Sequence, residues 1–283
     1  MTEQAARSPL WRRLPELVGA ASFAGLDAVY SSIAYVGAFA RLVGAALDRT
    51  MRAITRTGQP IRLYHLVEQS IRVGVKAIPI VMLVQVFIGL ILALNMAPTL
   101  QSYGQLERTA DVVAVAILRE LGPLITAVLL SGFAGASIAA ELGTMVEGEE
   151  IKALRAEAID PIRFLVVPRM FATSVMMVGL AIIADIMGVL GGLFTGTLIL
   201  GLNARAYLEE TRSAILLSDY FTGLLKSLVF GVIIAGLACH EGLSVKGGAE
   251  GVGRATTTTV VKCIVLLIVA DSIFAAVFYT LGW

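Results

Sequence analysis

Charged residues are scarce in this chain. Of its 283 residues, 15% are charged and 57% are hydrophobic, whereas soluble domains average about 25% charged and about 45–50% apolar residues. The mean hydropathy is +0.84. This composition excludes an ordinary soluble globular domain and indicates a protein that lies mostly within a membrane.

Residues that carry chemistry are also rare. The chain has two cysteines, Cys239 and Cys263, and two histidines, His65 and His240, and none of them forms a metal-ligand spacing. It lacks the glycine-rich lysine loop that holds nucleotide phosphates and the motifs of zinc proteases and serine hydrolases. A net charge of +1 without basic-aromatic patches argues against nucleic acid. We therefore predict no catalytic residue, no metal site and no cofactor in this chain.

Long hydrophobic runs are what the sequence does have. A membrane-spanning helix needs about 20 mostly apolar residues, and the runs are continuous rather than alternating, which excludes barrel strands. We predict an all-α integral membrane protein with an N-terminal interfacial helix, five transmembrane helices and a cytoplasmic coupling helix. The predicted spans are about 72–96, 112–141, 162–202, 224–242 and 258–281, and the coupling helix is about 147–158.

Two segments leave alternatives open. Residues 14–48 read as an amphipathic helix on the bilayer surface, within an N-terminal region 1–62 that precedes a membrane domain 63–283, but an extra span fits too. Residues 164–202 are long enough for one protruding helix or for a tight hairpin near Asp185–Gly188; we favour one helix, and hence five spans. Residues 205–222 are expected to form an amphipathic helix at the outer surface.

The basic residues predict the orientation. Seventeen of the 22 Lys and Arg fall before residue 77, in 141–169 or in 240–262, all on one side of a five-span topology. Because cytoplasmic loops carry an excess of Lys and Arg, the N-terminus and the coupling helix are predicted to be cytoplasmic. The C-terminus is predicted to lie outside.

Ionisable residues at membrane depth are the first candidate site. Arg119, Glu120, Lys226 and Asp271 fall in or at the ends of predicted spans, as does Asp185. Each charge costs on the order of 2.5–3.5 kcal/mol at the centre of a membrane helix, so each needs a partner or a watery cavity. Two interpretations remain open: ion pairs that fix helix register, or a cavity for a polar headgroup shaped by Arg119, Glu120, Lys226 and Asp271.

Small residues form a second pattern. Gly188, Gly192 and Gly196 recur every four residues and so share one helix face. Such faces let helices approach closely in lipid. The pattern predicts helix packing within one subunit or a dimer seam.

The charged segment between spans two and three is the third candidate. Glu147, Glu149 and Glu150 are predicted in the first turn of its helix, where they complement the helix dipole. Ile151 and Leu154, three residues apart, are predicted to form an apolar knob on one face. A simple connection is one interpretation, and docking into the groove of a partner fits the pattern better.

Over residues 60–281 the chain resembles the MlaE/YrbE permease family of lipid-transporting ABC systems. The residues that carry the resemblance are Leu118–Pro123, Ala140–Met145, Glu149–Leu154, Asp160–Arg169, Lys226–Gly231 and Gly247–Thr257. At Lys152 this chain has a base where the family usually has an acid, so details of the partner contact are expected to differ.

The resemblance implies a permease subunit in the bacterial inner membrane that moves phospholipid or a similar amphiphile. It implies a homodimer with the cavity at its seam, a separate ABC ATPase that holds ATP and Mg and docks on the coupling helix, and a periplasmic MCE-domain protein that exchanges lipid. The alternatives are an ion-coupled secondary carrier, with Asp185 and Asp271 titrating, and a passive membrane scaffold.

Overall fold

The computed structural model describes residues 30, 33–52 and 63–282. The chain divides into two compact units, Met1–Gly44 and Ala45–Trp283. In the first unit, residues 33–44 are helical. Of the predicted surface helix 14–48, residues 14–29, 31 and 32 lie outside the described residues.

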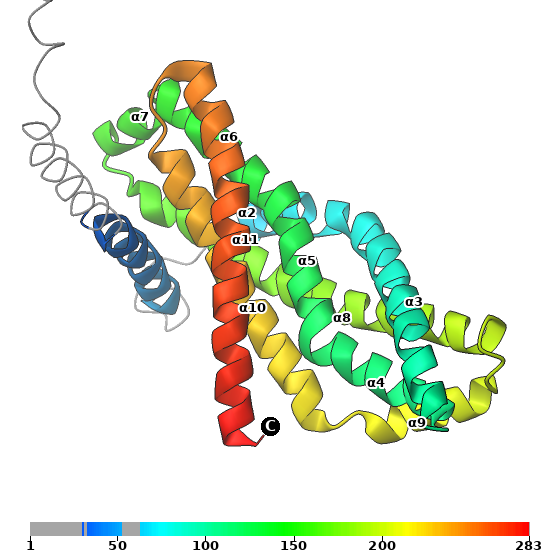
Figure 1. Cartoon of the computed structure of the whole chain (residues 1–283). Coiled ribbons are helices and arrows are strands. Elements are labelled where there is room, and N and C mark those ends of the chain that lie inside the picture. The colour runs from blue at the N-terminus through cyan, green and yellow to red at the C-terminus, as the bar shows by residue number, and fades with distance from the viewer. Residues whose placement is uncertain (1–29, 31–32, 53–62, 283) are drawn as a thin grey trace, which may run out of the picture. The chain divides into compact units, whose positions relative to one another are not determined.

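The second unit is built from helices and short helical turns (Figure 1). After helical residues 45–52, in chain order they are α2 (Leu63–Val73), η2 (Val75–Ala77), α3 (Ile78–Ser102), η3 (Leu106–Arg108), α4 (Thr109–Ala116), η4 (Ile117–Leu121), α5 (Gly122–Leu130), η5 (Ser131–Gly135), α6 (Ala136–Glu147), α7 (Glu150–Ala156), η6 (Ile162–Val166), α8 (Val167–Leu198), α9 (Ala204–Ala214), α10 (Leu217–Leu243) and α11 (Gly248–Leu281). The described residues contain no strand.

Five helical segments in the described part of the chain are long and apolar enough to cross a membrane. They are Leu66–Ser102, Leu106–Glu147, Ile162–Leu198, Leu217–Leu243 and Gly248–Leu281. The prediction of an all-α membrane protein with five spans is therefore confirmed. Most of these helices extend beyond the predicted spans. Polar residues at the ends continue the helix but do not belong to the apolar run from which each span was predicted.

The stretch 164–202 is one long helix, so the hairpin alternative is wrong. The π-helical turn η6 leads directly into α8, which continues to Leu198. The chain reverses only afterwards, through Gly201 at φ +71°. Asn203 then caps α9, its side chain accepting hydrogen bonds from the N–H groups of Arg205 and Ala206.

The predicted outer helix 205–222 is in fact two helices. α9 ends at Ala214, and Ile215 and Leu216 have extended backbone before α10 begins. Asp219 stabilises the new start, since its Oδ2 accepts the N–H of Leu216 at 2.9 Å. A carboxylate in the first turn of a helix satisfies an otherwise unpaired N–H and complements the dipole.

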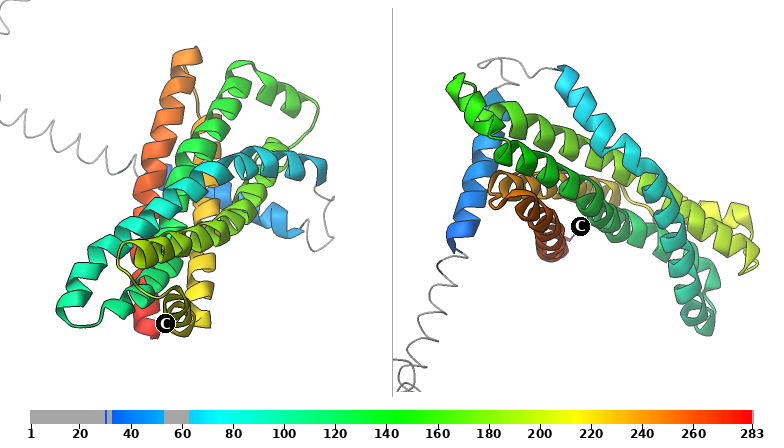
Figure 2. Two further views of the ribbon diagram at one scale, coloured as in Figure 1. Left: turned by 90° about the vertical axis from the view of Figure 1, so that its right-hand side faces the viewer. Right: turned by 90° about the horizontal axis from the view of Figure 1, so that it is seen from above.

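α8 lies centrally in the bundle and packs against α3 and α10, while α10 also packs against α6 and α11 (Figure 2). Small residues allow the closest approach. A side chain at Gly89 in α3 would collide with the backbone oxygen of Gly188 in α8. α7 lies at one end of the bundle, and α9 and the end of α11 lie towards the other (Figure 1). The charged sites described next lie in the two halves of the bundle between these ends.

Candidate functional site

A π-helical turn places the first two candidate residues. Arg119 and Glu120 lie in η4, between α4 and α5 of the second span. Single π turns inside α-helices change the direction in which side chains point and occur often at functional sites. Pro123 follows in the first turn of α5, where its missing N–H is tolerated.

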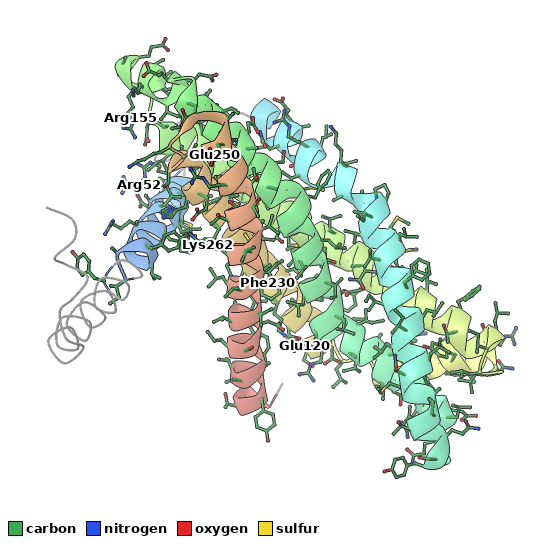
Figure 3. The ribbon with its side chains drawn as sticks, turned by 45° about the horizontal axis from the view of Figure 1, so that its top comes forward. Arg52, Glu120, Arg155, Phe230, Glu250 and Lys262 are labelled. Atoms are coloured by element: carbon green, nitrogen blue, oxygen red, sulfur yellow. The ribbon has the colours of Figure 1, made fainter. Side chains whose placement is uncertain are left out.

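Lys226 of α10 is the centre of a buried ion cluster. Its Nζ lies 2.6 Å from Glu120 Oε1 and 3.0 Å from Asp271 Oδ1. The Lys226 side chain is 1% exposed, that of Asp271 is 15% exposed and that of Glu120 is 41% exposed. The cluster joins η4, α10 and α11, and Figure 3 shows Glu120 far from Arg155 and Glu250, which lie at the α7 end. Three of the four predicted cavity residues therefore meet in one contact.

Arg119 pairs with a residue outside this cluster. Its Nε lies 3.3 Å from Oδ1 of Asp219, which is buried and whose other oxygen caps α10. Sequence reasoning missed Asp219 as a site residue. The signal was its spacing, because Asp219, Thr222 and Lys226 follow one another at three and four residues and so share a face of α10.

A cavity of about 630 Å³ opens beside this cluster. Its lining combines charged and apolar side chains. It is lined by Asp111, Val112, Val115, Ala116, Arg119, Glu120, Thr222, Lys226, Ala275, Phe278 and Tyr279. Asp271 is not part of the lining but pairs with Lys226. The volume is within the roughly 300–1,000 Å³ typical of small-molecule sites.

The apolar lining residues were missed, although helical spacing could have found them. Val112, Val115 and Ala116 precede Arg119 at intervals of three or four residues. Ala275 and Phe278 follow Asp271 at four and seven residues. Projecting each charged residue one and two turns along its helix identifies these positions.

The glycine face of α8 packs within this chain. A side chain at Gly188 would press on Ile117 at 3.0 Å, and one at Gly196 would come within 2.7 Å of the Tyr207 ring. Of the two options that the pattern left open, helix packing within the subunit accounts for Gly188, Gly192 and Gly196. Tyr207 of α9 is 2% exposed, and this burial raises its pKa to about 12.

The charged segment is shorter than predicted. α6 continues through Glu147, so this residue ends α6, and of the three glutamates only Glu150 lies in the first turn of α7. Glu149 makes the turn between the helices with φ +59°. Its carboxylate pairs with Lys152 Nζ at 2.6 Å, and this hydrogen bond and charge lower the pKa of Glu149.

The predicted apolar knob of α7 does not face outward. Ile151 is buried in its own chain and Leu154 is half-buried, whereas Lys152, Arg155 and Glu157 are exposed. The exposed face of α7 is therefore charged. Both helix ends are fixed by residues with positive φ, since Ala158 at φ +59° follows α7 and the N–H of Ile159 donates to Leu154 O at 2.9 Å.

A second ion cluster lies in the half of the bundle that carries α7. Glu141 of α6 accepts from Arg72 of α2 at 2.7 Å and from Arg169 of α8 at 2.9 Å. The Arg169 side chain is 6% exposed, and it also donates to Leu165 O at 2.8 Å. Arg169 was not predicted as a site residue. Across the described residues, no group of three or more His, Cys, Asp or Glu side chains could hold a metal ion.

The fold and cavity define a class: a multi-pass helical membrane protein with an ion cluster at membrane depth beside a mainly apolar cavity that also carries charged residues. Comparison with known proteins defines the family. Residues 66–277 match the family described as Permease MlaE, so the chain belongs to the MlaE permease family.

Several curated relatives are similar over most of their length. A "Probable ABC transporter permease protein" of Rickettsia felis is 35% identical over 244 residues, which cover 86% of this chain and 92% of that one. The "Intermembrane phospholipid transport system permease protein MlaE" of Haemophilus influenzae is 31% identical over 218 residues, covering 77% and 84%. The chloroplastic protein TRIGALACTOSYLDIACYLGLYCEROL 1 of Arabidopsis thaliana is 30% identical over 212 residues, covering 75% and 61%.

Proposed function

We propose that this chain is the membrane subunit of an ATP-driven transporter that moves phospholipid, or a similar amphiphile, between the bacterial inner membrane and a periplasmic carrier of the MCE type. The observation that carries the proposal is the cavity. It combines charged and apolar lining residues in a bundle of helices long enough to span a membrane. The relatives' names, which include ABC transporter permeases and a phospholipid transport permease, support the same function.

The two kinds of lining residue suit the two ends of such a molecule. Arg119 is about a third exposed and Glu120 is 41% exposed, so both can meet a headgroup. Lys226 is 1% exposed and pairs with Glu120 and Asp271, so it fixes the position of these carboxylates. Val112, Val115 and Phe278 line the cavity with apolar surface on which lipid tails are favourably buried.

The energy input is proposed to come from a separate ATPase chain that carries ATP and Mg²⁺ and grips the exposed charged face of α7. Its position supports this role, because a two-residue turn joins α7 to α6 and a short loop joins it to η6 and α8. α6 packs against α10 and α11, the helices of Lys226 and Asp271. A movement of α7 would thereby reach the cavity.

A second copy of this chain is proposed to complete the transporter. In the apolar stretch of α11 that could cross a membrane, 11% of the residues are buried within the chain, whereas 61% are buried in the corresponding stretch of α10. Such an apolar helix suits contact with a second subunit or with lipid. We place the α7 end in the cytoplasm and the α9 end outside, as the basic residues predict.

The test is lipid flux in liposomes that contain the purified complex with its ATPase. Lys226→Glu places a third carboxylate in the cluster and should reduce ATP-dependent flux at least tenfold while the ATPase still co-purifies. The matched control is Lys246→Glu, an exposed position outside the cavity, which should keep normal flux. Normal flux in the Lys226→Glu variant, or equal wild-type flux without ATP, would refute the proposal; the latter would favour an ion-coupled carrier.

A further inference from the structure

Asp185 is a buried acidic residue that the cavity does not use. It lies in the middle of α8 with a relative exposure of 4%. Its Oδ1 is fully buried, and within the described part of the chain no hydrogen-bond or ion-pair partner reaches it. The carboxyl lies against the backbone of Gly122, where any side chain would collide with Oδ1. The glycine at the start of α5 therefore makes the room for this carboxyl.

The same junction holds a second buried oxygen without a donor. Gln85 of α3 donates through Nε2 to the carbonyls of Leu121 and Gly122, both at 3.3 Å, and to Thr126 Oγ1 at 3.4 Å. Its own Oε1 is buried and has no donor among the described residues. The junction of η4 and α5 is thus short of hydrogen-bond donors. Unpaired buried acceptors are costly, so such a deficit indicates a missing proton or cation.

No positive charge compensates Asp185. The elements that pack against α8 include α2, α3, α4, α5, α9, α10, η4 and η6, and α3 and α5 carry no charged residue. Several charged groups of the bundle are engaged elsewhere: Arg119 with Asp219, Lys226 with Glu120 and Asp271, Arg72 and Arg169 with Glu141, and Arg108 with Asp111. None of the ion pairs of the described residues includes Asp185. An ionised carboxylate here would cost several kcal/mol.

We infer that Asp185 is a proton-binding site, whose carboxyl takes one proton from water and sits in the folded protein as a neutral acid. Protonation removes the uncompensated charge and creates the one hydroxyl donor that the junction lacks. A metal cation is the poorer ligand, because hard cations need several oxygen ligands around them. Here the carboxyl is instead packed against a glycine backbone.

Asp185 lies next to the turn that carries two of the cavity residues, so its proton affects the cavity. Gly122 directly follows η4, the turn that carries Arg119 and Glu120. Loss of the proton would place an unpaired negative charge against that turn. The proton on Asp185 therefore stabilises the packing of α8 on η4, and with it the position of the two cavity residues.

The test is infrared spectroscopy of the purified full-length protein at neutral pH, comparing wild type with Asp185→Asn. The wild type should show a carbonyl band of a protonated carboxyl that is lost in D185N. The matched control is Asp160→Asn, which removes a carboxylate paired with Arg49 at 2.7 Å; its loss should leave that band unchanged. Because asparagine mimics the neutral acid, D185N should also keep the wild-type melting temperature.

Three results would overturn the inference. One is an unchanged protonated-carboxyl band in D185N, which would mean that Asp185 is ionised. Another is a D185N protein that fails to fold or melts well below the wild type. The third is a wild-type band that appears only when sodium and potassium are removed, which would assign the site to a metal cation.

Discussion

Replacing Lys226 with methionine tests the energetics of the buried ion cluster. Methionine keeps much of the aliphatic volume of lysine but removes the ammonium that lies 2.6 Å from Glu120 and 3.0 Å from Asp271. Two carboxylates are then left side by side without a cation. The change should destabilise the protein, and the size of the loss follows from how enclosed each partner is.

Removing one partner of a buried ion pair costs about 3–5 kcal/mol, because a charge remains without compensation. Asp271 is 15% exposed and has little access to water, so this range applies to Lys226→Met. Glu120 is 41% exposed to the cavity, and a contact of that kind contributes about 1 kcal/mol or less. The expected order of destabilisation is Lys226→Met, then Asp271→Asn, then Glu120→Gln.

The assay is a double-mutant cycle measured by reversible unfolding in mixed detergent. The variant Lys226→Met with Asp271→Leu removes both the cation and the most enclosed carboxylate. With Asp271→Leu measured as the second single variant, the double variant should recover most of the roughly 3–5 kcal/mol that Lys226→Met alone loses, since replacing a whole buried pair by apolar groups is often neutral or better. If the losses of the two single variants simply add in the double variant, Lys226 and Asp271 are not energetically coupled and the reasoning is wrong.

Three further predictions follow from the packing and topology. Gly196→Ala should destabilise the protein by about 1–3 kcal/mol in thermal unfolding, because the new methyl meets the Tyr207 ring, whereas Gly179→Ala in the same helix meets nothing within 4 Å and should be neutral or stabilising. Ala158→Gly should raise stability by about 1 kcal/mol or less, since it relieves a positive φ of +59°; a loss of stability would contradict this. A cysteine at exposed position 152 should react with an impermeant thiol reagent only from the cytoplasmic side, and one at position 279 only from outside, in a chain without Cys239 and Cys263; the reverse pattern would invert the topology.

The membrane spans and the charged residues within them could be predicted from the sequence. Apolar runs of span length have few alternatives in a membrane, and a charge at that depth is costly enough to require a partner. Lys226, Glu120 and Asp271 could therefore be identified before their contacts were known. Arg119 was identified for the same reason, but its partner Asp219 was assigned to a surface helix because the break at residues 215–216 has no proline or glycine to mark it.

Other features depend on tertiary packing and leave little local trace. Ile151 and Leu154 share a helix face, but a seven-residue helix can turn that face towards its own chain or away from it, and here Ile151 is buried. Gly192 and Gly196 of α8 pack against the buried side chain of Tyr207. Tyr207 lies in α9, after the chain has reversed direction. The π turn that carries Glu120 has no composition that distinguishes it from α-helix. These contacts could not have been predicted from local pattern.

The π turns η4, η5 and η6 have a consequence for how the second and third spans tolerate change in length. Each accommodates an additional residue in a helix that otherwise advances by about 100° per residue. Deleting one residue within 117–121 removes the additional residue and restores regular α-helix, so the helix faces on the two sides keep their register. A single deletion is thus expected to be tolerated better there than in the regular α-helical parts of the same spans, where it would rotate one side by that angle.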